Sequence, residues 1–130
     1  MKRTLMFLVF ALATAIGLAA QEADPNIARA ERIFGFLKAN QADSLYANMA
    51  DEVMPLVSRD ALVGVMSKAE YMAGQYKGRG PWEVKIVASH RSYVSMLRFE
   101  RARLALLIVF NDAGRMLGLQ LLLPEVLGMD

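Results

Sequence analysis

The second half of the chain consists of short apolar stretches joined by connectors of only a few residues. Four stretches rich in Val, Ile, Leu and aromatic residues read as strands: 82–90, 93–100, 103–110 and 115–123. Residues 111–114 (Asn-Asp-Ala-Gly) are a strong hairpin signal, and residues 90–91 and 101–102 are candidate tighter turns. Because such short connectors join antiparallel neighbours, this half predicts a four-stranded antiparallel meander.

The part of the chain before residue 82 has apolar residues at helical spacing. It predicts helices over residues 25–39, 42–54 and 58–76, with Asp24 and Ser58 as N-caps. Gly78, Gly80 and Pro81 are expected to end this helical half. Helices followed by strands are typical of an α+β fold in which the helices pack on one face of the sheet.

The first 20 residues have the form of a secretory signal peptide. A basic start, Lys2-Arg3, precedes an apolar run over residues 5–16 and then the small residues 17–20, so cleavage is expected after Ala19 or Ala20. The alternative is an uncleaved membrane anchor, but residues 5–20 fall short of the roughly 20 residues that span a bilayer. The sequence thus predicts a leader over residues 1–20, a single domain over residues 21–130, and export to the periplasm or beyond the cell.

The charge and the chemistry-bearing residues exclude several classes of function. Without Lys2 and Arg3, the remaining 13 basic and 13 acidic side chains balance, so no basic excess favours nucleic acid. There is no cysteine for disulfides or thiolate metal sites, and the single histidine, His90, is interpreted as an exposed turn residue. No phosphate-binding glycine loop or nucleophilic serine motif occurs. We therefore expect no metal and no cofactor.

Several short motifs resemble a known family. They are Gly74-Gln75-Tyr76, the extended segment 82–87, and the hairpin segment 110–119 that leads to Pro124. They resemble a secreted bacterial family of unknown function in the NTF2-like (cystatin-like) superfamily, which also occurs as a module ahead of α/β-hydrolase domains. The resemblance covers about residues 27–124. It implies a cone of helices on a curved sheet, an apolar cavity between the two, and often a dimer formed through the sheet. It carries over no catalytic residue.

Two functions follow as hypotheses. Enzymes of that superfamily use a carboxylate or histidine base together with tyrosines, and Asp43 and Tyr46 lie three residues apart on the second predicted helix. They are the candidate pair of an isomerase- or dehydratase-like enzyme, unless Asp43 only solvates the helix start. The leading hypothesis is instead a non-catalytic module that binds a small apolar ligand or a protein partner. Its candidate ligand-binding residues are Tyr46, Met66, Tyr76 and Tyr93.

The last two predicted strands are apolar on both faces, which a sheet with one solvated face would not be. If two of their side-chain columns share a face, they form a patch that a homodimer would bury through the sheet. A folded-back segment, residues 126–129, or another protein is the alternative cover. The two columns are Ala105, Leu107 and Val109, and Leu117, Leu119 and Leu121.

Overall fold

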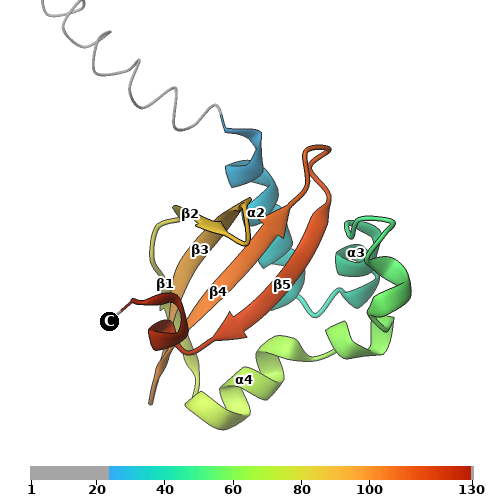
Figure 1. The fold of residues 1–130 in the computed structure, drawn as a ribbon. Coiled ribbons are helices and arrows are strands. Elements are labelled where there is room, and N and C mark those ends of the chain that lie inside the picture. The colour runs from blue at the N-terminus through green and yellow to red at the C-terminus, as the bar shows by residue number, and fades with distance from the viewer. Residues whose placement is uncertain (1–23, 130) are drawn as a thin grey trace, which may run out of the picture.

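The computed structural model describes residues 24–129, and Figure 1 shows how they are arranged. Helices come first and strands second, which confirms the predicted α+β class. The expected leader, residues 1–20, lies outside the described residues. Among the helices of residues 24–129, none is both long enough and apolar enough to cross a bilayer.

Helix α2 (Pro25–Lys38) begins where the sequence predicts. The Asp24 carboxylate accepts a hydrogen bond from the Asn26 backbone N–H at 3.0 Å, and Pro25 occupies the first helical turn, where its missing N–H costs nothing. The apolar side chains at helical spacing are buried: Ala30, Ile33, Phe34 and Leu37. This helix therefore packs on the sheet with its N-terminus fixed by Asp24.

The other two predicted helices are shorter than expected. Helix α3 (Ala42–Ala47) stops because residues 48–50 pair with the backbone of Met116, which donates to the Asn48 carbonyl at 2.9 Å. The predicted helix 58–76 is a 3-10 helix, η2 (Arg59–Leu62), followed by helix α4 (Val65–Ala73). Gly64, with a left-handed φ of 69°, separates them. A further 3-10 helix, η1 (Met54–Leu56), lies between α3 and η2.

The sheet has five antiparallel strands, so the expected count of four is wrong. The extra strand is β1 (Tyr76–Arg79), which begins at the last residue of the predicted helix 58–76 and lies where the helical half was expected to end. Both β1 and β2 (Glu83–Val87) pair with β3 (His90–Phe99), one with each half of it. Gly80 and Pro81 separate β1 from β2. The chain nevertheless stays beside β3, since the Gly80 N–H still bonds the Met96 carbonyl at 2.9 Å.

The remaining strands continue the order β3, β4 (Arg103–Phe110) and β5 (Met116–Leu122), and the sheet is not closed. The predicted turns at residues 101–102 and 111–114 are confirmed. The β2–β3 turn, however, lies at Ala88-Ser89, both with positive φ, and His90 is already the first residue of β3.

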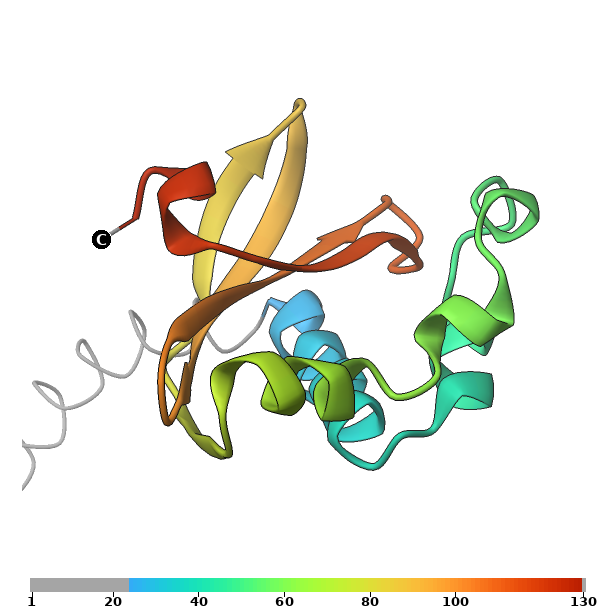
Figure 2. The same ribbon diagram turned by 90° about the horizontal axis from the view of Figure 1, so that it is seen from below.

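Both faces of the sheet carry apolar side chains that are buried. Helices α2 and α4 cover one face over a core that includes Leu97, Leu106 and Ile108. The opposite face, here called the outer face, has a second cluster around Val94, Ala105 and Leu107. Figure 2 shows the C-terminal 3-10 helix η3 (Pro124–Leu127) on that side, with the tip of the β2–β3 hairpin, opposite α2 and α4.

Candidate functional site

The outer face carries an apolar pocket that the C-terminal segment leaves uncovered. Its volume is about 390 Å³. The end of β2 and the start of β3 form one wall, the start of β5 forms the other, and β4 forms the floor. Among the residues that line it, only His90 and Gln120 have polar side chains. The full lining is Val87, Ala88, His90, Leu107, Val109, Leu117, Gly118, Leu119 and Gln120. A pocket of this size, mostly apolar with few polar groups, is typical of a small-molecule site.

Two local features of β5 leave this space open. Gly118 lies opposite Val109 and has no side chain, and a Cβ built there would lie 3.9 Å from the nearest Val109 atom. A β-bulge follows, because Val109 pairs with Gly118 whereas Phe110 pairs with Met116. Leu117 is therefore the additional residue of the strand, and it joins the pocket wall.

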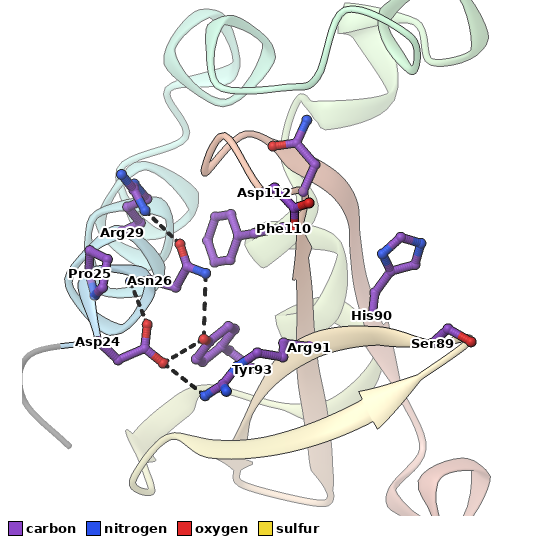
Figure 3. A pocket seen from close by; sticks show the side chains of 11 residues that line it. Asp24, Pro25, Asn26, Arg29, Ser89, His90, Arg91, Tyr93, Phe110 and Asp112 are labelled. Carbon is purple, nitrogen blue, oxygen red and sulfur yellow. Dashed lines mark hydrogen bonds and ion pairs between the residues drawn. The ribbon is translucent and has the colours of Figure 1, made fainter. Parts of the chain in front are cut away.

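A second, polar pocket of about 570 Å³ lies between the N-terminus of α2 and the sheet (Figure 3). Its central contact is the Tyr93 hydroxyl, which donates to Asp24 Oδ2 at 2.6 Å. Arg91 also reaches Asp24 Oδ2, at 3.3 Å, and the Asn26 amide donates to the Tyr93 oxygen at 3.5 Å. His90 lies at the far end of this pocket, away from the Asp24 contacts.

These contacts hold Asp24 in its ionised form. Burial by itself would raise the pKa of the Asp24 carboxyl, but hydrogen bonds from the Tyr93 hydroxyl and the Asn26 backbone N–H, together with the Arg91 charge, outweigh it and lower that pKa. A carboxylate with a lowered pKa is a weak proton acceptor, and this one already accepts hydrogen bonds on both oxygens. The arrangement therefore suits the attachment of α2 to β3 better than acid–base catalysis.

The structure does not bring the predicted carboxylate–tyrosine pair together. Asp43 faces solvent, with 79% of its side chain exposed, and it pairs with Arg59, which lowers its pKa through a hydrogen bond and charge. The Tyr46 hydroxyl donates instead to the Met54 carbonyl at 3.2 Å. The alternative hypothesis, an isomerase- or dehydratase-like site at Asp43 and Tyr46, is therefore not formed by these two residues.

The four predicted ligand-binding residues do not converge either. Tyr46 and Met66 belong to the core beneath the helices. The Tyr76 ring packs edge-on against Phe34 and Phe99, with ring centres 5.9 Å and 5.8 Å away. Only Tyr93 lines one of the pockets described above, the polar one. The aromatic and methionine side chains that suggested a pocket are mainly core packing.

The structure divides the patch that the two predicted interface columns would form if they shared a face, because two of the three β5 leucines lie on the opposite face from the β4 column. Directly paired residues of neighbouring strands share a face, and Leu119 pairs with Ile108 while Leu121 pairs with Leu106. Leu119 and Leu121 therefore face the helices, whereas Ala105, Leu107 and Val109 face outward. Of the β5 column, Leu117 alone joins the outer pocket. The register set by the β4–β5 hairpin and its bulge decides which face of the sheet each β5 leucine occupies.

The outer column is partly covered by the chain itself. Leu127 and Met129 pack against the cluster of Val94, Ala105 and Leu107. This contact confirms the folded-back C-terminal segment that was considered as the alternative cover. What stays open on this face is the pocket above Gly118.

An apolar cavity also lies between the helices and the sheet, but it is small, about 160 Å³. That is below the usual range for ligand pockets. It is lined by Leu37, Val57, Ala61, Leu62, Val65, Leu106, Leu119, Gln120 and Leu121, and so it lies beside β5.

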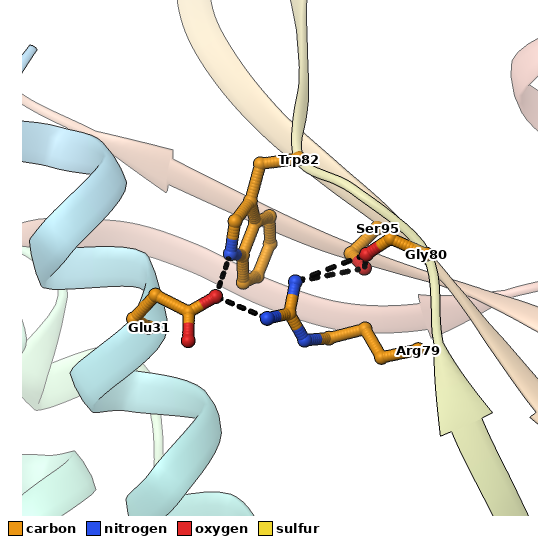
Figure 4. Close-up of polar contacts among 5 residues, drawn as sticks. All are labelled: Glu31, Arg79, Gly80, Trp82 and Ser95. Atoms are coloured by element: carbon orange, nitrogen blue, oxygen red, sulfur yellow. Dashed lines mark hydrogen bonds and ion pairs between the residues drawn. The ribbon is translucent and has the colours of Figure 1, made fainter. Parts of the chain in front are cut away.

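Sequence analysis missed a second polar cluster, which connects α2 to the break between β1 and β2 (Figure 4). Glu31 accepts hydrogen bonds from Arg79 and from the Trp82 indole, the latter at 2.5 Å. Arg79 lies over the Trp82 ring, 5.0 Å from its centre, and Ser95 bonds the Gly80 carbonyl at 2.8 Å. No sequence pattern pairs residues this far apart, and the cluster serves to hold the interrupted strand.

Within residues 24–129, no group of three or more His, Cys, Asp or Glu side chains could hold a metal ion. Comparison of the chain with protein-family models, with curated proteins and with solved structures finds no match.

Proposed function

We propose that this protein is an exported, non-catalytic module that binds a small apolar ligand in the outer-face pocket. The observation that carries the proposal is that pocket of about 390 Å³, lined by apolar side chains and floored by β4. Its volume lies in the range of small-molecule sites, and His90 and Gln120 supply the few polar groups that orient a ligand. The leader pattern of residues 1–20 supports export.

We also propose that the fold is NTF2-like, on the basis of its layer arrangement. Helices packed on one face of an antiparallel sheet, and the small cavity between them, support it. The ligand in this proposal is nevertheless placed on the outer face, because the cavity beneath the helices is less than half as large.

A pocket-filling substitution tests the proposed function. The probe is N-phenyl-1-naphthylamine, a neutral apolar dye whose fluorescence rises when it leaves water. Gly118→Leu places a side chain in the open space above Val109. The matched control is Gly35→Leu on α2, where a new Cβ has nothing within 4 Å. Dye binding should be lost in the first variant and kept in the second.

Two results would contradict the proposal: no dye binding by the unaltered protein, or equal binding by both variants. Circular dichroism melting of each variant ensures that lost binding reflects a filled pocket rather than unfolding. Native mass spectrometry of the protein purified from its own host would then identify the retained ligand.

A further inference from the structure

The two edges of the sheet differ in how well they are protected from pairing with another strand. An exposed edge presents unpaired backbone N–H and C=O groups, and proteins blunt it with charges, proline and bulges. The edge formed by β1 and β2 has all three. It carries Lys77, Arg79, Glu83 and Lys85, a bulge after Tyr76, and the Gly80-Pro81 interruption.

The β5 edge has neither charge nor proline along its open length, and its bulge, at Leu117, lies at the end of that stretch. From Met116 to Leu123 the chain has no charged residue and no proline. Met116 is already occupied, since it bonds the backbone of Asn48 and Ala50. Pro124 has no N–H to donate. Within the described residues, the open stretch is therefore residues 117–123, and its central residue is Gln120.

We propose that a second copy of this chain pairs with β5 along this edge, antiparallel, with the two-fold axis at Gln120. With the axis at Gln120, all of residues 117–123 can pair with the partner. Leu117 lies opposite Leu123 of the partner subunit, and Leu119 lies opposite Leu121 of the partner subunit. The two five-stranded sheets become one continuous sheet. This dimer differs from the face-to-face one predicted from the sequence. Its axis residue, Gln120, also lines the outer-face pocket.

Four observations favour a second copy over another protein. A two-fold axis brings a charge near the axis close to its own copy, and a strand without charges avoids that repulsion. Gln120 is exposed, and its amide both donates and accepts, so it can bond its own copy. Leu119 and Leu121 line the 160 Å³ cavity beside β5, so the partner's equivalent leucines extend that apolar surface. Leu123, 56% exposed, is covered by the pairing.

Charge placed at the axis tests the proposal. Gln120→Lys and Gln120→Glu each put two like charges across the two-fold, and both side chains are tolerated by an exposed position in the single chain. Each variant alone should sediment as a monomer at concentrations where the unaltered protein is a dimer. A mixture of the two should restore a dimer containing one copy of each. Val84→Lys, an exposed position on β2, is the control and should leave the dimer unchanged.

The proposal is overturned if the unaltered protein is a monomer at every concentration, or if Gln120→Lys dimerises as well as the unaltered protein. A mixture of the two charged variants that stays monomeric also overturns it. Melting curves of both variants should match that of the unaltered protein diluted until it is monomeric, since neither change touches the buried core.

Discussion

Removal of the Tyr93 hydroxyl measures how strongly α2 is held to the sheet. The Tyr93 ring is fully buried, and its hydroxyl donates to a carboxylate that is only 18% exposed. Tyr93→Phe keeps the ring and its edge-on contact with Phe110, but leaves Asp24 without this donor. A hydrogen bond to a charged group is worth about 1.5–3 kcal/mol, and Asp24 keeps its bonds from Asn26 and Arg91. We therefore expect a loss of about 2 kcal/mol in the free energy of unfolding.

For a domain of this size that loss lowers the melting temperature by about 9 °C. The assay is thermal and urea unfolding followed by circular dichroism. Tyr71→Phe is the matched control, because that side chain is 88% exposed and its hydroxyl should contribute nothing. If the two variants are equally stable, the Asp24–Tyr93 bond does not hold the helix and the reasoning is refuted.

The dependence of this loss on pH has a definite sign. The pKa of Asp24 is lower in the folded chain than in the unfolded chain, so its contribution is complete above the ordinary carboxyl pKa of about 4. The contribution disappears as the pH falls through the lower, folded value. Because Tyr93 is one cause of the lowering, the difference between Tyr93→Phe and the unaltered protein should shrink below about pH 4. A difference that grows in acid contradicts this account.

Two further predictions concern the leader and the glycines. The exported protein should begin at Ala20 or Gln21, which N-terminal sequencing decides, and intact Met1 in a membrane fraction would contradict it. Gly64→Ala should destabilise by about 1 kcal/mol because φ is 69° there, whereas Gly35→Ala, exposed within α2, should stabilise by a similar amount. Urea unfolding measures both, and changes of the same sign would show that backbone conformation does not control these sites.

The candidate site shows where sequence reasoning stopped. Asp24 was correctly expected as the N-cap of α2, a role set by its immediate neighbours. Its bond to Tyr93, 69 residues along the chain, follows no periodic pattern. The pocket on the outer face depends on a bulge at Leu117, and a single additional residue in one strand leaves no signature in an apolar run.

The sequence by itself determined the properties that depend on near neighbours. The α+β order, the capped start of α2 and the hairpin at residues 111–114 all rest on local spacing and turn chemistry. The apolar content of β4 and β5 likewise indicated that both faces of the sheet are covered.

Only the tertiary structure decided the register and the contacts between distant segments. Side chains alternate across a strand, so the one-residue shift at the bulge determines whether Leu119 faces the helices or the outer pocket. Pairing of residues 48–50 with Met116 ended α3 against its local preference, because backbone hydrogen bonds to β5 replaced those of the helix. Strand pairing thus sets the faces, edges and pockets on which the proposed functions rest. Local sequence patterns do not encode that pairing.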